Sequence, residues 1–418
     1  MMKEHYDIAV IGGGAAGLVA GITAARKGAR VLIAEKEARV GRKLLATGNG
    51  RCNFTNRYTA VKHYHGADPD FTAYANTRFS PADNEAFFRS LGVMAVEEEE
   101  GKVYPLSLQA AAVLDMLRLE TERRSIALRV SMEIQELLPR KKGFLLKSGD
   151  ASFFAEKVIV ACGGMASPEL GGCGLGYRLL ESCGHRRTAL APALVKIKTD
   201  NRLTNGLKGI KVEGVLTLRK RGKAVGRERG EILFTDFGIS GPPVLQLSRC
   251  LCFEPPEDFV AELDLLPQWE EEELLALLRE RRELLGDSTL EYYLTGLVQK
   301  KVGQLLLKEA LASKLSRLGG DLSEEELKRV AGILKHFSLE VKGVLGWKQA
   351  QVTAGGVVTA DFDPETMESR IVPGLYAIGE VLDIDGDCGG FNLQWAWAGG
   401  RLAGECAAEN VVVERTRA

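Results

Sequence analysis

The feature that most constrains the fold of this chain is a glycine cluster near its N-terminus, between an apolar run and a helix-forming stretch. The apolar run covers Ile8–Ile11, and a second one covers Val31–Ala34, after a helical stretch that ends near Lys27. The cluster contains three glycines in GxGxxG spacing, which are Gly12, Gly14 and Gly17. A strand, a glycine turn, a helix and a second strand in this order predict a βαβ unit with parallel strands. An α/β fold is therefore expected.

Each glycine has a physical task if this unit holds a dinucleotide. Gly12 permits the tight turn, Gly14 lets the backbone approach a pyrophosphate, and Gly17 lets the helix pack closely on the strand. The helix then starts at Ala15 and Ala16, where free backbone N–H groups and the positive end of the helix dipole favour phosphate. These five residues are predicted to contact the cofactor.

A carboxylate at the end of the second strand completes the pattern. Glu35 lies 18 residues after Gly17, a position from which an acid accepts hydrogen bonds from a ribose hydroxyl. Lys36 follows directly and is counted with it as a candidate contact. GxGxxG alone is common, but the flanking strand, helix and acid make this pattern specific. The N-terminal unit is predicted to bind an adenine dinucleotide.

A second glycine-rich segment lies near the C-terminus. A buried-type strand, Leu375–Ile378, runs into it, and Gly389-Gly390 opens a helix near Asn392. Two helix starts can hold the two ends of a cofactor larger than NAD, and FAD fits that requirement. The segment contributes seven candidate contacts: Gly379, Glu380, Asp383, Gly390, Phe391, Asn392 and Leu393.

The composition is that of an ordinary globular protein. The chain has 418 residues, a net charge of −1 and eight cysteines. The charge balance argues against a nucleic-acid partner, and no segment has the ~18 continuous apolar residues that would suggest a membrane partner. Scattered cysteines without a CxxC pair favour a reducing cytoplasm. His63 and His65 lack a nearby acidic or cysteine cluster, so no metal is expected. The oligomeric state is left open.

The sequence pattern changes twice along the chain. Residues 194–265 carry short alternating strands, which predict a β-barrel-like layer. Residues 266–342 turn helical and charged, with apolar residues at i, i+3 and i+4. Glycine-rich strand and turn character resumes at Gly343. The nucleotide-binding domain is therefore expected to comprise residues 1–193 and 343–418, with a barrel-like and a helical module inserted into it.

Seven further motifs occur along the chain: Gly41–Lys43, Thr47–Asn56, Gly101–Pro105, Leu233–Pro242, Val352–Val357, Thr366–Ser369 and Gly379–Asn392. Two strings among them, residues 48–56 and 366–369, are far more specific than GxGxxG. With these motifs the chain resembles, over nearly its whole length, the HI0933-like family of bacterial NAD(P)/FAD-dependent oxidoreductases. The resemblance implies an FAD-binding Rossmann-like domain of the glutathione-reductase type, interrupted by a β-barrel-like and a helical insertion. This agrees with the segmentation above.

The resemblance also implies roles for individual residues. Arg42 and Lys43 would lie along the phosphates, and Ile134, closing the strand after Leu128, would meet the adenine with its backbone. Asp383 would order the ribityl–pyrophosphate region, and Phe391–Leu393 would face the flavin pyrimidine edge. One glycine loop would pass near the flavin, and its candidate contacts are Gly48, Asn49, Gly50, Arg51 and Asn53.

The family includes reductases of conjugated 3-oxo-4-ene steroids. The resemblance therefore implies a small-molecule substrate and the reduction of its conjugated double bond. Hydride from flavin N5 would add to the β-carbon of a steroid or bile-acid-like enone, and an acid would protonate the α-carbon. Cys52 and Tyr104 are the candidate proton donors. Because the chain shows a single strand–GxGxxG–helix unit, NADH or NADPH is expected to dock transiently as the hydride donor.

Two other functions remain open from the sequence. Some family members are labelled amine oxidases, so an FAD-dependent oxidase of a small amine such as aminoacetone is one alternative. An RNA-associated flavoprotein is another, and the basic stretch Arg219–Arg229 is its motivating feature.

Overall fold

The computed structural model describes residues 4–417 and divides into two compact units. The first unit joins residues 1–192 to residues 351–418, and the second comprises residues 193–350. Each unit has its own hydrophobic core. Within residues 4–417, no helix is both long enough and apolar enough to span a bilayer.

The first unit is organised by a seven-stranded sheet of order β7-β2-β1-β10-β9-β8, with β19 also pairing with β10. The strands β7, β2, β1, β10 and β19 are mutually parallel, whereas β8, β9 and β10 form an antiparallel meander. The bounds are β1 (Glu4–Ile11), β2 (Val31–Ala34), β7 (Ala127–Arg129), β8 (Glu136–Pro139), β9 (Phe144–Ser148), β10 (Ala151–Val160) and β19 (Leu375–Ala377).

The parallel strands are buried on both faces, as their apolar sequences require. Residues 6–11 of β1 and all four residues of β2 are buried, and Ile8 pairs with Val31 and with Lys157. The helices of this unit are α1 (Ala15–Arg26), α2 (Arg42–Ala46), α3 (Ala73–Arg78), α4 (Pro81–Ser90), α5 (Ala110–Arg123), α6 (Leu175–Ser182) and α13 (Phe391–Arg417). Helices α1, α6 and α13 contact strands of the sheet, whereas α3 and α4 pack on α13, and α2 and α5 pack on each other.

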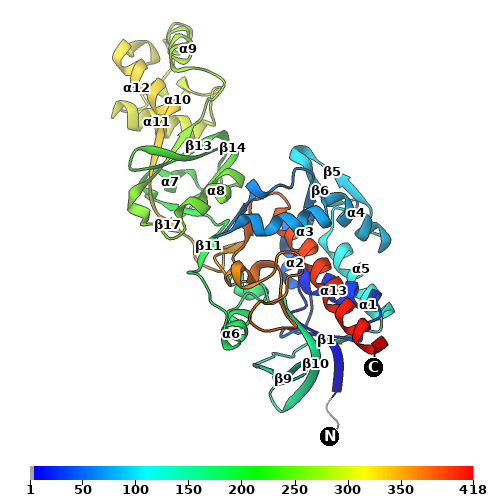
Figure 1. Ribbon diagram of the computed structural model, residues 1–418. Coiled ribbons are helices and arrows are strands. Elements are labelled where there is room, and N and C mark those ends of the chain that lie inside the picture. The colour runs from blue at the N-terminus through cyan, green and yellow to red at the C-terminus, as the bar shows by residue number, and fades with distance from the viewer. Residues whose placement is uncertain (1–3, 418) are drawn as a thin grey trace. The chain divides into compact units, whose positions relative to one another are not determined.

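The first and last helices of this unit pack directly on each other (Figure 1). A Cβ placed on Gly400 of α13 would lie 2.7 Å from the carbonyl oxygen of Ala16, and one on Gly404 would lie 2.5 Å from that of Ala20. Because Ala16 faces Gly400 and Ala20 faces Gly404, the two helices run parallel. Their N-terminal ends therefore point in the same direction.

Three small sheets accompany the large one, and two of them include strands from the segment after α2. β3 (Thr55–Asn56), β6 (Lys102–Pro105) and β5 (Ala95–Glu97) form one, and β4 (Tyr64–His65) pairs with β20 (Asp385–Gly386). The chain leaves the unit through β11 (Ala191–Ala193) and re-enters through β18 (Val352–Ala354), which form the third.

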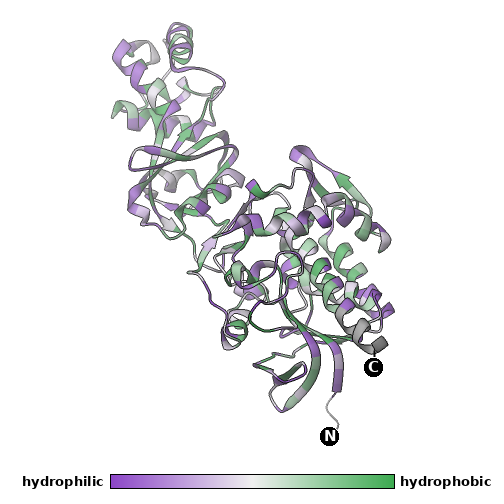
Figure 2. Ribbon diagram, viewed as in Figure 1, coloured by the Kyte–Doolittle hydropathy of each residue, from purple (hydrophilic) through white to green (hydrophobic). Residues whose placement is uncertain are grey.

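The second unit contains a closed barrel of order β12-β15-β14-β13-β16-β17. Its strands are β12 (Ile197–Thr199), β13 (Lys211–Lys220), β14 (Lys223–Thr235), β15 (Gly238–Ser240), β16 (Phe259–Asp264) and β17 (Phe337–Val344). Its helices are α7 (Asn201–Thr204), α8 (Pro242–Leu247), α9 (Glu271–Leu284), α10 (Leu290–Tyr293), α11 (Lys300–Leu311) and α12 (Glu324–Lys335). Helices α9 and α12 carry both hydrophilic and hydrophobic residues along their length (Figure 2), as amphipathic helices do.

The barrel and the helices are not the separate modules that the sequence suggested at 194–265 and 266–342. Strand β17 follows the helices and closes the barrel, and residues of both contribute to one core. Lys335, at the end of α12, pairs with Asp264 at the end of β16 at 2.7 Å and donates to the carbonyl of Trp269 at 2.6 Å. The alternation of residues 337–344 was missed because it directly follows a strong helical pattern.

Candidate cofactor site

The glycine turn after β1 has the close contacts that its spacing predicts. Gly12 has a φ of +110°, and a Cβ there would lie 2.4 Å from the carbonyl oxygen of Ala161. A Cβ on Gly17 would lie 1.9 Å from the carbonyl oxygen of Gly12. Since no Cβ fits at either position, only glycine allows β1, β10 and α1 to approach this closely.

Gly14 differs from these two glycines because the space where its side chain would point is empty. A Cβ on Gly14 would have no atom within 4 Å, and no side chain caps the N-terminus of α1. The first intrahelical bond joins the N–H of Leu18 to the carbonyl of Gly14, so the N–H groups of Ala15, Ala16 and Gly17 have no intrahelical acceptor. This is the geometry that a pyrophosphate needs.

Glu35 is held beside the turn by two backbone donors. Its Oε2 accepts from the N–H of Gly13 at 2.7 Å, and its Oε1 accepts from the N–H of Glu37 at 2.8 Å. The N–H of Met132 donates to the carbonyl of Glu35 at 2.8 Å, which brings the segment with the buried Ile134 next to it. Ile134 does not close the strand as expected, because β7 ends at Arg129. It lies in the irregular segment that follows.

Basic residues around the turn are paired with carboxylates. Lys36 donates to Glu37 at 2.6 Å, and Arg42 pairs with the same carboxylate. The hydrogen bonds from Lys36 and Arg42 lower the pKa of the Glu37 carboxyl. Lys43 pairs with Glu380 at 2.7 Å. The last contact joins the N-terminal and C-terminal halves of the predicted site, which lie more than 300 residues apart in the sequence.

The loop after α2 is tightly wound through left-handed backbone. Four of its residues have positive φ: Gly48 (56°), Asn49 (56°), Gly50 (84°) and Cys52 (61°). Glycine and asparagine adopt this conformation readily, but a cysteine does so at a cost. The loop is closed by the bond from the N–H of Cys52 to the carbonyl of Thr47, at 2.9 Å. The guanidinium of Arg51 lies 4.3 Å above the ring of Tyr104.

Asn53 is the residue at which the two halves meet. A Cβ on Gly48 would lie 2.8 Å from its backbone nitrogen, and one on Gly390 would lie 2.7 Å from its Oδ1. That Oδ1 is buried and has no hydrogen-bond partner. A buried acceptor left unsatisfied costs about 1–3 kcal/mol. An N–H group of a bound ligand would remove this cost.

The start of α13 is fixed by Asn392. Its Oδ1 accepts from the N–H of Gly386 at 2.8 Å, and its Nδ2 donates to the carbonyl of the same residue at 2.7 Å. Phe391 is buried beside it, and Leu393 packs against the core. Asp383 is buried and accepts from the N–H of Ala67 at 3.3 Å.

The two helix starts are offset along a common direction. Gly400 faces Ala16, yet α13 begins at Phe391, nine residues earlier, while α1 begins at Ala15. At 1.5 Å of rise per residue, the start of α13 extends roughly 12 Å beyond the start of α1. An extended cofactor can therefore have its phosphates at one helix and a ring system at the other. The open side of Gly14 and the unsatisfied Asn53 acceptor fit FAD.

The two candidate proton donors are both enclosed. Cys52 is 0% exposed, and burial raises the pKa of its thiol to about 12. Tyr104 is 8% exposed, and burial also raises the pKa of its phenol. Their assignment as donors stays a prediction.

Sequence reasoning missed a cluster of polar side chains beside α13. His63 and His65 have an acidic partner after all, because both rings contact the carboxylate of Asp387. Asp387 lies more than 300 residues further along the chain, so no local spacing signals it. The group of His, Asp and Glu side chains with metal-ligand spacing within residues 4–417 is a different one: His5, Asp7 and Glu156.

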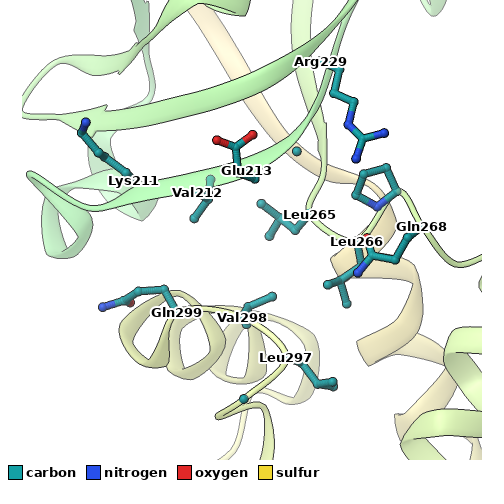
Figure 3. A pocket seen from close by; sticks show the side chains of 13 residues that line it. Lys211, Val212, Glu213, Arg229, Leu265, Leu266, Gln268, Leu297, Val298 and Gln299 are labelled. Carbon is teal, nitrogen blue, oxygen red and sulfur yellow. The ribbon is translucent and has the colours of Figure 1, made fainter.

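The second unit contains a pocket of about 450 Å³ that none of the predicted site residues line. Lys211 and Arg229 lie on opposite sides of it, with Val212, Leu265 and Val298 between them (Figure 3). Lys211 pairs with Glu231 at 2.8 Å. Arg229 has no carboxylate partner among the residues that the structure describes.

Comparison with known proteins places these features in context. The family model of the HI0933-like protein Rossmann domain matches residues 6–406. The 3-dehydro-bile acid delta(4,6)-reductase of Clostridium scindens (strain ATCC 35704) is 37% identical over 411 residues, covering 96% of this chain and 99% of that protein. The ribosomal RNA dihydrouridine synthase of Escherichia coli (strain K12) is 33% identical over 405 residues, covering 94% of this chain and 96% of that protein.

A solved structure shares the fold. The open conformation of a flavocytochrome c3 fumarate reductase is 16% identical, with a TM-score of 0.51, and the match covers 98% of this chain and 79% of that one. The matches confirm the expected α/β Rossmann-type fold and an oxidoreductase. They support FAD binding.

Proposed function

This chain belongs to the HI0933-like family, and from that premise we propose that it reduces carbon–carbon double bonds conjugated with a carbonyl group, using FAD and NADH or NADPH. The observation that carries the proposal is the bile acid reductase relative, which is 37% identical over 96% of this chain. The open helix start after the glycine turn and the second helix start at α13 support the binding of one dinucleotide.

The names of the relatives describe one kind of chemistry. A 3-oxo-4-ene steroid has its double bond conjugated with the C3 carbonyl, and the uracil ring has its C5–C6 double bond conjugated with the C4 carbonyl. Reduction of either needs a hydride at the β-carbon, a proton at the α-carbon and stabilisation of the charge that develops on the oxygen. A C=C reductase is thus consistent with both relatives.

In this proposal the chain holds and tunes the cofactor. The N–H groups of Ala15 and Ala16 bind the pyrophosphate, and Glu35 binds the adenosine ribose. Asn53 Oδ1 accepts a hydrogen bond from the ring system. The first turn of α13, at Asn392, presents N–H groups that stabilise negative charge nearby. Bound FAD supplies hydride transfer, and the protein controls its position and surroundings.

We propose a steroid or bile-acid-like enone as the substrate, and ribosomal RNA as the second candidate. The relative with the bile acid name has the higher identity of the two. The RNA candidate is favoured by three cations on β14, Lys223, Arg227 and Arg229, for which no carboxylate partner is found within residues 4–417. The neighbouring Arg219 and Arg221 are paired with Glu262 and Asp258 at 2.9 Å each.

An anaerobic titration tests the proposal. NADH or NADPH should bleach the flavin absorbance of the purified protein, and an added 3-oxo-4-ene steroid should restore it with formation of the saturated ketone. Restoration by a uridine-containing ribosomal RNA fragment alone would replace the steroid candidate with the RNA candidate. Bleaching by aminoacetone with peroxide formation in air would identify an amine oxidase. Failure of both nicotinamides to bleach the flavin would refute the proposal.

The RNA candidate has its own matched variants. Replacing Arg227 and Arg229 with glutamine removes two unpaired cations, whereas replacing Arg219 and Arg221 removes two paired ones. If RNA binds through β14, the first double variant should reduce the salt dependence of binding by about two ion releases and the second should have the smaller effect. Equal effects would argue against this surface.

A further inference from the structure

A carboxylate clamped between two imidazoles lies beside the start of α13. His63 Nδ1 is 3.0 Å from Asp387 Oδ2, and His65 Nε2 is 2.7 Å from Asp387 Oδ1. Both oxygens of one carboxylate are thus occupied by two different rings. The second nitrogen of His63 has no hydrogen-bond partner within residues 4–417, and the His63 side chain is 24% exposed.

The backbone around the three residues is fixed independently of their side chains. The N–H of Asp387 donates to the carbonyl of His63 at 2.9 Å, and β4 pairs with β20 through His65 and Asp385. Asn392 Nδ2 also donates to the carbonyl of Asp387, at 3.3 Å. The imidazole of His63 is therefore held in one orientation from two segments far apart in the sequence.

This imidazole also touches the helix end that we assign to the flavin. The His63 ring stacks on the ring of Phe391, with centroids 4.3 Å apart and planes 14° from parallel. Phe391 is the first residue of α13 and follows Gly390, whose Cβ would collide with Asn53. Tyr64 donates its hydroxyl to the Phe391 carbonyl at 3.1 Å, which fixes the contact.

We propose that His63 is the proton donor of the reduction and that Asp387 and His65 are positioning residues; this rests on the proposed function. Histidine is the side chain that most often acts as a general acid in enzymes. In this proposal Nδ1–H donates to the Asp387 carboxylate, and Nε2 carries the proton that is transferred. Cys52 and Tyr104 fit the role of proton donor less well, because both side chains are buried.

The step balances in atoms and electrons. With FAD bound, the β-carbon would accept a hydride whose two electrons derive from NADH or NADPH. The π pair of the double bond moves toward the α-carbon and the carbonyl oxygen. The α-carbon then takes the proton from His63 Nε2, and the neutral imidazole recovers a proton from water. Asp387 holds the His63 ring in place through its contact with Nδ1.

The first test measures whether His63 lies close to the flavin, and it does not depend on turnover. The chain has five histidines, so their ring C–H signals can be resolved by NMR in the holoenzyme, and the His63 signal is the one absent from the His63→Gln variant. Reduction of the bound flavin with dithionite should shift the His63 signal and leave that of His5 unchanged. His5 is the control because it lies at the start of β1, at the opposite end of this strand from the glycine turn, where it stacks on Phe154 of β10. An unmoved His63 signal would overturn the proposal.

The second test isolates the proton-transfer step. Dithionite-reduced holoenzyme is mixed anaerobically with a 3-oxo-4-ene steroid or with uridine-containing RNA, and flavin reoxidation is followed. His63→Gln should slow reoxidation by about 100-fold or more, as loss of a general acid does. Asp387→Asn should slow it less, and His5→Gln should leave it unchanged. Reduction of His63→Gln by NADH or NADPH should proceed at the wild-type rate.

The outcomes separate this proposal from the one on which it rests. If the wild type is reoxidised and His63→Gln is reoxidised equally fast, His63 is not the donor but the C=C reductase stands. If neither acceptor reoxidises the wild type, the proposed function fails and the donor assignment fails with it.

Discussion

Two single-methyl substitutions in the glycine turn separate folding from cofactor binding. In Gly17→Ala the new Cβ would lie 1.9 Å from the carbonyl oxygen of Gly12, a backbone atom that cannot rotate away. Such overpacking costs about 3 kcal/mol at the upper end of its usual range. The gain in helix propensity returns about 1 kcal/mol. The net loss of about 2 kcal/mol corresponds to a decrease in Tm of roughly 4–8 °C for a unit of this size.

Gly14→Ala should weaken FAD binding and have little effect on the stability of the fold. The new Cβ meets no atom within 4 Å, and the φ of −81° suits alanine, so the FAD-free protein should lose less than about 1 kcal/mol. The methyl group would nevertheless stand where the pyrophosphate approaches. We expect FAD affinity to fall at least about tenfold, or ~1.4 kcal/mol.

Thermal unfolding of the FAD-free proteins and fluorescence titration with FAD measure both quantities. Gly28→Ala is unsuitable as a control because Gly28 has a φ of +95°, whereas Gly206→Ala adds a methyl in open space outside the site. A Gly14→Ala protein that binds FAD as tightly as the wild type would refute the assignment of the phosphates to this turn. Equal Tm losses in Gly14→Ala and Gly17→Ala would refute the packing argument.

Three further predictions concern single side chains. Burial raises the pKa of Cys52 to about 12, so iodoacetamide at pH 8 should leave this thiol unmodified in the folded protein, and rapid alkylation detected by mass spectrometry would contradict its burial. The hydrogen bond from Arg317 lowers the pKa of Glu326 from 4.5 to about 2, so Glu326→Gln should remove about 1–3 kcal/mol of stability at pH 7. This stabilisation is present above pH 4.5 and is lost as the pH falls toward 2, so the variant and wild type should converge in acid unfolding; a constant difference would be inconsistent with linkage. Lys43→Met breaks the ion pair with Glu380 and should weaken FAD binding about fivefold, or ~1 kcal/mol, in the same titration, whereas unchanged affinity would mean that the pair does not support the site.

The opening unit was predictable because its signals are local. Apolar strands, glycine spacing and the terminal acid all lie within residues 6–35, and the structure places β1, α1 and β2 there. The family comparison confirms the Rossmann-type fold. The glycine geometry at Gly12 and Gly17 follows directly from the spacing.

The remaining parts depend on contacts between distant segments. Neither the pairing of Asp387 with His63 and His65 nor the approach of Gly390 to Asn53 has a periodic signal, because each joins residues more than 300 positions apart. The barrel closure by β17 was missed for a related reason, since its partners β12 and β16 precede the inserted helices. Local sequence patterns identify helices and strands, whereas the pairing of strands across an insertion leaves no local pattern in the sequence.

The parallel packing of α1 on α13 has a consequence for biosynthesis. The groove that receives Gly400 and Gly404 is exposed from the time α1 leaves the ribosome until α13 emerges. At 5–20 residues per second this interval lasts roughly 20–80 s, long enough for residues 193–350 to acquire their own core first. During that interval the apolar face of α1 is a natural target for chaperones, and ribosome-bound chains stalled before α13 should be protease-sensitive in the N-terminal segment.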